Sequence, residues 1–315
     1  MAEVKKIATR EAYGQALVDM GVKNERLVVL DADLAAATKT GAFKKAYPER
    51  FFDAGIAEGN MMSLAGGLST MGYTVFASTF AMFAAGRAFE QVRNTIGYPH
   101  LNVNIGATHA GISVGEDGAS HQCCEDIALM RTIPGMTIIN PADYTEAYAA
   151  VVAAAALEGP VYLRFGRLAV PYLFDETYQF EIGKGVQLRA GNDVTIAATG
   201  LMVQEALIAA EQLANEGINA RVINIHTIKP LDKEILVKAA QETGAVVTAE
   251  EHSIIGGLGG AVAEALSEAC PVPVLRVGVE DRFGSSGPAV EMLKVYGLEA
   301  ANIAAKAKAA IAVKV

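Results

Sequence analysis

The sequence has few cysteines and no apolar run long enough to cross a membrane. Its three cysteines form no ligand pattern, because Cys123 and Cys124 are adjacent and Cys270 stands alone. The most apolar helical stretch, residues 147–157, is too short to span a bilayer, and the first residues lack the apolar core of a signal peptide. We therefore expect a reduced, cytoplasmic protein with no membrane segment.

Charged side chains are also scarce, and Lys and Arg nowhere gather in a run. The formal net charge of -9 argues against a nucleic-acid-binding protein. Only 19% of the 315 residues are charged, whereas 52% are hydrophobic. So much apolar side chain indicates a large buried interface, formed either with a different chain or with a second copy of this one.

Apolar, strand-like segments alternate with helical segments along the chain, which predicts parallel βαβ units and an α/β fold. The predicted strands are 27–31, 51–56, 73–77, 101–106, 136–139 and 160–165, followed by 193–198, 219–225, 245–249 and 272–277. The alternation breaks over a polar and aromatic connector. We therefore divide the chain into a domain at 1–171, a linker at 172–186 and a smaller domain at 187–315.

One carboxylate, Glu58, follows a strand-like segment in a stretch with little other charge. Its neighbours Ile56, Met61 and Met62 are apolar. Apolar surroundings disfavour the ionised form of a carboxylate, so Glu58 is a candidate for handling a proton. The alternative is an exposed glutamate that caps the following helix.

The segment 108–122 carries the highest density of reactive side chains, namely His109, Glu116, Asp117 and His121, interleaved with glycines. It is too long for a simple connection, and its histidines suit proton transfer and recognition of hydroxyl groups. The alternative is a hydrogen-bonded surface loop. The spacing of its histidines and acids matches no zinc site, and no metal site is predicted on this chain.

Three arginines, Arg10, Arg164 and Arg167, are candidate anion contacts. The last two follow a predicted strand at the same sheet edge as Asp33 and Glu58. A guanidinium group suits a phosphate monoester, although each arginine can instead form a surface ion pair.

Two other features of the second domain point to structure rather than chemistry. The Gly-rich segment 250–262 lacks the spacing of a dinucleotide site, so we predict that its glycines allow close packing. We assign structural roles to His226 and His252.

Three motifs, taken together and in this order, resemble the second half of transketolase. They are GIAEGNM (55–61), STFAMFAAGRAFEQVR (78–93) and THAGISVGEDGASHQ (108–122). The resemblance implies a domain that binds the pyrimidine of thiamine diphosphate, followed by a smaller C-terminal domain. Thiamine diphosphate enzymes hold the diphosphate through Mg²⁺ on a GDG motif, which this chain lacks.

The resemblance therefore implies the C-terminal subunit of a split, two-subunit transketolase. An N-terminal transketolase subunit that carries the GDG motif would supply the site for the diphosphate and for Mg²⁺ or Ca²⁺. The implied assembly is an α2β2 particle with the cofactor between the two kinds of chain.

The resemblance also implies roles for individual residues. Glu58 is assigned to the aminopyrimidine ring nitrogen, where the two groups share a proton. Phe83 would stack on the pyrimidine with Phe80 beside it, and Asp33 is similar to an acidic residue near the cofactor.

The substrate contacts follow in the same way. His109, Asp117 and His121 would recognise sugar hydroxyls, and the two histidines would also move protons. Arg10 and Arg167 would contact the substrate phosphate, with Arg164 as the alternative to Arg167. Two positions depart from the family pattern, because Ala37 replaces a serine and Gly86 replaces a tyrosine. Both departures bear on the choice of sugar phosphate.

The implied reaction is the transfer of a ketol unit between sugar phosphates, as in the pentose phosphate pathway. Related halves of deoxyxylulose-phosphate synthase and of the 2-oxo-acid dehydrogenase β-subunit remain alternatives. So do split transketolases that act on branched or sulfonated sugars. A non-catalytic scaffold subunit is the alternative from another class, and the intact set of site residues argues against it.

Overall fold

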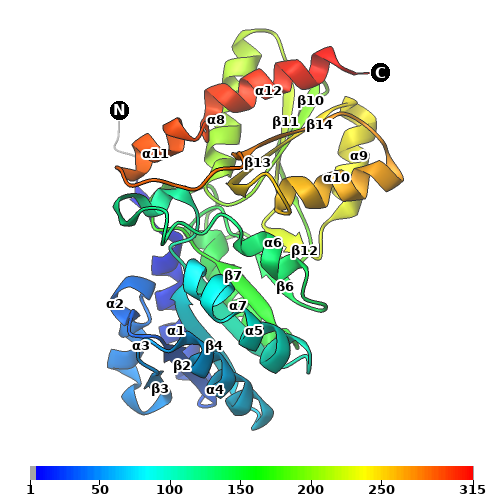
Figure 1. The fold of residues 1–315 in the computed structure, drawn as a ribbon. Helices are drawn as coiled ribbons and strands as arrows, with labels where there is room; N and C mark the ends of the chain where they lie inside the picture. The colour runs from blue at the N-terminus through cyan, green and yellow to red at the C-terminus, as the bar shows by residue number, and fades with distance from the viewer. Residues whose placement is uncertain (1–4, 315) are drawn as a thin grey trace.

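Two mainly parallel sheets, one in each half of the chain, form the framework of the protein (Figure 1). The computed structural model describes residues 5–314. In Figure 1 the first half runs from blue to green and lies below the second half, which runs from green to red. The α/β fold predicted from the alternation of strands and helices is confirmed.

The first sheet has seven strands in the order β12-β6-β7-β5-β4-β2-β3, and only the pairing of β12 with β6 is antiparallel. Its strands are β2 (Leu27–Asp31), β3 (Phe51–Asp53), β4 (Thr74–Phe80), β5 (Val103–Thr108), β6 (Thr137–Ile139), β7 (Val161–Arg164) and β12 (Thr227–Lys229). Helices cover both faces of this sheet, which explains why nearly every residue of its central strands is buried. The carboxyl ends of β2, β4, β5 and β7 share one edge, which is where open α/β sheets bind ligands.

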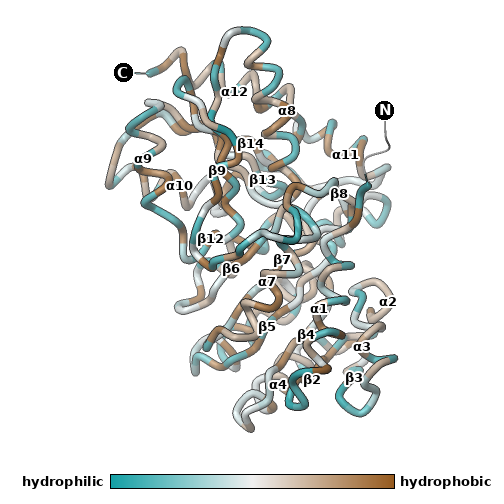
Figure 2. The backbone as a smooth tube through the Cα atoms, turned by 180° about the vertical axis from the view of Figure 1, so that it is seen from behind, coloured by the Kyte–Doolittle hydropathy of each residue, from teal (hydrophilic) through white to brown (hydrophobic). Residues whose placement is uncertain are grey.

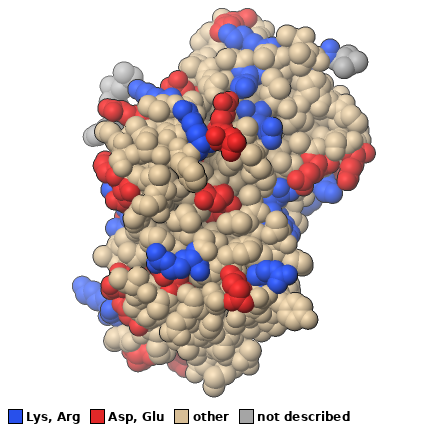
Figure 3. All heavy atoms as spheres, in the orientation of Figure 1, with Lys and Arg blue, Asp and Glu red and all other residues tan. Residues whose placement is uncertain are grey.

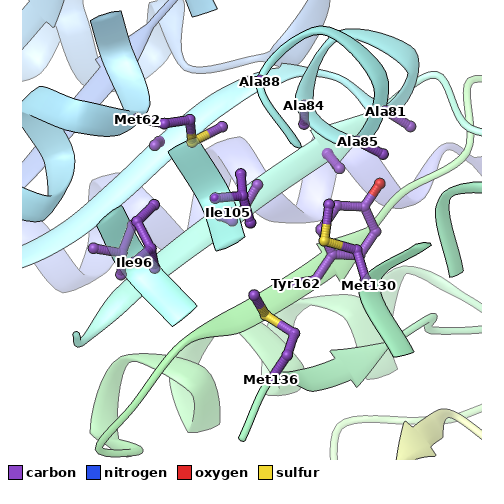
Figure 4. Close-up of a cluster of buried hydrophobic side chains, with 14 of the residues drawn as sticks. Met62, Ala81, Ala84, Ala85, Ala88, Ile96, Ile105, Met130, Met136 and Tyr162 are labelled. Atoms are coloured by element: carbon purple, nitrogen blue, oxygen red, sulfur yellow. The ribbon is translucent and has the colours of Figure 1, made fainter. Parts of the chain in front are cut away.

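Helices on the two faces of the first sheet enclose two separate cores. The helical segments are α1 (Thr9–Lys23), α2 (Ala35–Thr38), α3 (Gly41–Ala46), η1 (Pro48–Arg50), α4 (Glu58–Thr70), η2 (Phe83–Arg87), α5 (Phe89–Gln91), η3 (Val92–Gly97), η4 (Ile112–Asp117), α6 (Asp126–Arg131) and α7 (Tyr144–Ala156). α1, α3 and α7 pack on one face around Leu17, Phe76 and Val151. α4 and the η2–η3 segment pack on the other face, where Met62 and Ile105 lie in the cluster shown in Figure 4.

The second sheet has five strands in the order β14-β13-β10-β11-β9, of which only β9 is antiparallel to its neighbour. They are β9 (Val186–Arg189), β10 (Val194–Ala198), β11 (Ala220–Asn224), β13 (Val246–Ser253) and β14 (Val274–Val279). α8 (Met202–Asn215), α11 (Ala289–Val295) and α12 (Ala300–Ala312) pack in one cluster, and α9 (Lys233–Thr243) and α10 (Leu258–Ala269) in the other. In Figure 2 the brown, hydrophobic stretches of the tube follow the sheet strands of both halves.

The two halves interlock more closely than the sequence predicts. Strand β12 comes from the second half but pairs with β6 at the edge of the first sheet. A short two-stranded pairing of β1 (Lys6–Ile7) with β8 (Val170–Pro171) ties the start of the first half to its end. Strand β12 is only three residues long, too short to show a period in the sequence.

Three predicted strand ends near the motifs are wrong. β4 continues to Phe80 rather than ending at residue 77, and β13 continues to Ser253 rather than ending at residue 249. β3 ends at Asp53 rather than at residue 56, and α4 begins at Glu58.

One face of the first half carries few charged side chains, as Figure 3 shows over α4. Apolar side chains are exposed in this region, including Ile56, Leu64, Met71 and Tyr98. An uncovered apolar surface of this kind is typical of a protein–protein interface. Within residues 5–314, no helix is both long and apolar enough to cross a membrane.

Candidate active site

Several of the predicted site residues converge on the carboxyl edge of the first sheet. Phe80 is the last residue of β4, and His109 directly follows the last residue of β5. Arg10 lies in the first turn of α1, while Phe83 lies on η2 just after β4. Segments far apart in the sequence therefore meet at one place because their strands are parallel neighbours.

Glu58 is buried and ion-paired. Its carboxylate is 1% exposed and accepts from Nη1 of Arg87 at 2.9 Å and 3.0 Å, one distance to each oxygen. The alternative of an exposed capping glutamate is therefore wrong. The apolar surroundings predicted for Glu58 are also incomplete, because Arg87 supplies a compensating positive charge.

Arg87 reaches Glu58 from a widened, π-helical turn. The backbone N–H of Ala88 donates to the carbonyl of Phe83 at 3.0 Å, five residues back, which is the spacing of a π-helix. The guanidinium of Arg87 lies over the ring of Phe83, 4.6 Å from its centroid. We did not identify Arg87 from the sequence, although it is the single cation in the apolar run FAAGRAF.

Four rings form an aromatic wall beside this pair. The Phe80 and Phe83 centroids lie 5.8 Å apart with nearly parallel rings, and Phe80 stacks on His109 at 3.9 Å. His121 meets Phe83 edge-on at 5.4 Å. Sequence reasoning selected all four residues, and the structure brings them together.

His109 is held in one protonation state by its neighbours. Nη1 of Arg10 donates to its Nε2 at 3.2 Å, so the ring proton lies on Nδ1, which is 3.0 Å from the hydroxyl of Thr108. Burial, together with the charges of Arg10 and Arg167, lowers the pKa of His109 to about 3. The ring is therefore neutral near pH 7.

Three cations act electrostatically on the same imidazole. The charges of Arg10, Arg167 and Lys39 each lower the pKa of His109, and Arg10 contacts its ring directly. Arg167 binds the carbonyl of Val114 and lies 3.0 Å from a carboxylate oxygen of Glu116. The positive charge gathered beside His109 suits an anionic group such as a phosphate.

The other predicted acids are exposed. Asp117 is exposed at the end of η4. Asp33 is also exposed and has a left-handed backbone with φ of 60°. Its backbone N–H donates to Oδ1 of Asp53 at 3.1 Å.

A second buried carboxylate in this region is Asp31, which sequence reasoning missed. Its oxygens accept from the N–H of Leu34 at 2.6 Å and from the hydroxyls of Thr38 and Thr40 at 2.7 Å and 2.8 Å. Burial raises the pKa of Asp31 to about 6. Asp31 thereby anchors the segment that presents the carbonyl of Ala37 to Arg10 at 2.8 Å.

Arg164 is not brought into this cluster. It is 3% exposed, its Nε donates to Asp126 at 2.8 Å, and its Nη2 donates to the carbonyl of Glu251 at 2.9 Å. The second of these contacts joins the two halves of the chain. Of the two alternatives, Arg167 is therefore the arginine that remains for an anion contact.

The structural role predicted for His252 agrees with its contacts. This fully buried residue lies beside the Arg164–Asp126 pair, and its Nδ1 lies 2.8 Å from the carbonyl of Ser253. Its Nε2 accepts from the N–H of Ala128 at 3.3 Å, so both ring nitrogens have partners within the fold.

Neither a metal cluster nor a cavity near α7 adds to the site among the described residues. Residues 5–314 contain no group of three His, Cys, Asp or Glu side chains arranged to hold a metal ion. A cavity of about 700 Å³ lies between α7 and the connector, lined by aromatic side chains such as Tyr148, Tyr172 and Phe174. No predicted site residue lines it.

Comparisons with known proteins agree with the motifs. Residues 5–171 match the family model "Transketolase, pyrimidine binding domain", and residues 183–303 match "Transketolase, C-terminal domain". A solved structure described as "Split gene transketolase, inactive beta4 tetramer" is 55% identical. The likeness covers 99% of this chain and 100% of that one, with a TM-score of 0.91.

Two curated relatives place the likeness within the family. A 6-deoxy-6-sulfo-D-fructose transketolase subunit of Clostridium sp. is 45% identical over 93% of this chain and 91% of its own length. Human transketolase is 39% identical over 95% of this chain but only 48% of its own length. The chain therefore belongs to the transketolase family, of which it contains the pyrimidine-binding and C-terminal domains.

Proposed function

We propose that this chain forms the pyrimidine-binding half of a transketolase active site, which transfers a two-carbon ketol unit from a ketose phosphate to an aldose phosphate. The observation that carries this proposal is the convergence of a buried carboxylate, an aromatic wall and a cationic patch at one sheet edge. Glu58, Phe83 and His109 represent the three parts. The carboxylate and the aromatic wall suit the pyrimidine of the cofactor, and the cationic patch suits the phosphate of the substrate.

The residues present fit the pyrimidine of thiamine diphosphate, on which the transketolase family depends. A buried carboxylate beside an aromatic face suits a planar, basic ring that shares a proton with it. Thiamine diphosphate supplies the nucleophilic carbon and the electron sink that cleavage of a sugar carbon–carbon bond requires.

The residues of this chain have separate tasks in the proposed site. Glu58 holds a proton at the pyrimidine ring nitrogen, and Phe83 provides a stacking surface with Phe80 beside it. His109 is neutral and offers hydrogen bonding to a sugar hydroxyl rather than a positive charge.

The residues on the substrate side of the site also have separate tasks. Among the described residues, His121 has a hydrogen-bond partner only at Nδ1, namely Ser120 at 2.9 Å. Its Nε2 is therefore the better placed of the two Nε2 atoms to move a proton. Arg10 and Arg167 hold the substrate phosphate, and Asp117 contacts a hydroxyl.

We propose that an N-terminal transketolase subunit with a GDG motif supplies the site for the diphosphate and Mg²⁺ or Ca²⁺. The split-gene relative is described as an inactive β4 tetramer. This description supports the need for such a partner. The face with few charges over α4 supports a large interface, as in an α2β2 assembly.

A second candidate substrate is a sulfonated ketose. The Clostridium relative carries 6-deoxy-6-sulfo-D-fructose in its name, and Arg10 and Arg167 suit a sulfonate as well as a phosphate. Comparing kcat/KM for a ketose phosphate and its sulfonate analogue separates the two candidates.

Calorimetry of thiamine diphosphate with Mg²⁺ tests the proposal, first on this chain alone and then on its complex with the partner subunit. We expect binding only in the complex, and loss of binding in Glu58→Ala and Phe83→Ala. Val152→Ala, an exposed change on α7, is the control expected to bind normally. Tight binding by this chain alone would contradict the partner assignment, and no binding in either case would favour the scaffold alternative.

A further inference from the structure

Arg87 engages both features of the pyrimidine subsite at once. Its Nη1 contacts both carboxylate oxygens of Glu58, at 2.9 Å and 3.0 Å. The same guanidinium lies over the ring of Phe83, 4.6 Å from the centroid. A flat cation on an aromatic face, hydrogen-bonded to a carboxylate, presents the same combination of shape and donors as a protonated aminopyrimidine.

The exposures of the two charged groups differ strongly. Glu58 is 1% exposed, whereas Arg87 is 53% exposed. A buried carboxylate is costly unless a cation or a hydrogen-bond donor compensates it, so Glu58 requires some partner. Arg87 has no such requirement, because its guanidinium can return to water along its flexible stem.

The backbone around Arg87 lets the side chain leave without disturbing the core. The π-helical turn leaves Gly86 and Arg87 on its exposed side, while Ala84, Ala85 and Ala88 face the core. The core contacts of the turn therefore belong to its alanines, and the arginine contributes only its contacts to Glu58 and Phe83.

We propose that Arg87 is an internal competitor for the pyrimidine subsite, compensating Glu58 until a pyrimidine ring displaces it from Glu58 and Phe83. This inference rests on the proposed function and adds to it. The ring and the guanidinium cannot both stack on the same face of Phe83 while bonding to Glu58. The apparent cofactor affinity is therefore reduced by the fraction of molecules in which Arg87 covers the subsite.

The test compares thiamine diphosphate binding, with Mg²⁺, by complexes that contain wild-type chain, Arg87→Gln, Arg87→Ala or Arg93→Ala. Arg93→Ala is the matched control, because Arg93 is also exposed, lies on the following π-helical turn and contacts Asn94 instead of Glu58. Arg87→Gln keeps an amide donor for Glu58, which guards against misfolding of the alanine variant.

If Arg87 covers the subsite in about nine molecules of ten, Arg87→Gln and Arg87→Ala lower the Kd by about tenfold. Arg93→Ala leaves the Kd unchanged. In the cofactor-free chain, Arg87→Ala lowers the Tm, because Glu58 loses its compensating charge, and saturating thiamine diphosphate restores the Tm of the complex.

The outcomes separate this inference from the function on which it rests. A Kd that is unchanged or weaker in both Arg87 variants, with wild type binding, overturns the competitor role and leaves the proposed function intact. Absence of binding in all four complexes overturns the proposed function and this inference together. Binding gained only in the Arg87 variants supports both.

Discussion

Arg10 and His109 fix each other in a single arrangement, with Nη1 of the arginine 3.2 Å from Nε2 of the imidazole. An arginine is always a donor, so His109 must accept at Nε2 and carry its proton on Nδ1. The interaction links a cation to a neutral hydrogen-bonding ring at the edge of the first sheet.

Replacing Arg10 by alanine should weaken the use of phosphorylated ketoses. Loss of a charged hydrogen bond to a phosphate costs about 1.5–3 kcal/mol, so kcat/KM should fall roughly 10- to 100-fold. Steady-state kinetics with a ketose that lacks the phosphate provides the control, because that substrate should lose much less. An equal loss for both substrates would show that Arg10 does not contact the phosphate.

His109 should not titrate in the physiological range. Burial and the nearby arginines lower its pKa to about 3, so its ring resonances should stay constant from pH 8 to pH 5 in an NMR titration. The chain unfolded in urea supplies the reference for a freely titrating ring. A midpoint above pH 5 in the folded chain would contradict the neutral assignment, and Arg10→Ala should move the midpoint upward.

Asp31 should make stability depend on pH. Its pKa is raised to about 6 in the folded chain, from 3.8, so burial penalises its ionised form. The folded state then binds more protons than the unfolded state between about pH 4 and pH 6, and stability falls as pH rises through that window.

Urea unfolding of wild type and Asp31→Asn from pH 4 to pH 7 measures this effect. The stability of wild type relative to the variant should fall by about 2–3 kcal/mol across the window, since one pKa unit corresponds to about 1.4 kcal/mol. Glu146 and Glu251, with pKa values raised to about 7, contribute equally to both proteins and cancel. A pH-independent difference would mean that Asp31 is not the titrating group.

Asp126→Ala should destabilise the chain strongly, because it leaves Arg164 buried without its carboxylate partner. The expected loss is about 3–5 kcal/mol in the free energy of unfolding. Glu264→Ala is the control: Glu264 also pairs with an arginine, Arg131 at 2.6 Å, but it is 65% exposed, so the loss should stay below about 1 kcal/mol. Equal losses in denaturant unfolding would indicate that burial of the pair is unimportant.

The family motifs and the alternation of strands and helices were sufficient to predict the architecture. Parallel strands that are covered by helices on both faces have their carboxyl ends at one edge. That reasoning placed Asp33, Glu58, Arg164 and Arg167 at one edge, whereas the structure turns Arg164 toward Asp126 and the second half of the chain. The roles of these residues toward cofactor and substrate stay predictions.

What the sequence by itself determined about this protein is therefore the order and type of its elements, its family and the edge where its site lies. Only the tertiary structure decided which group each of the charged side chains contacts. Arg87 pairs with Glu58, Asp31 anchors the segment next to Arg10, and Arg164 joins the two halves instead of the site. The physical reason is that hydrophobic period and turn signals are local, whereas the partner of a buried charge comes from another element and depends on how the elements pack.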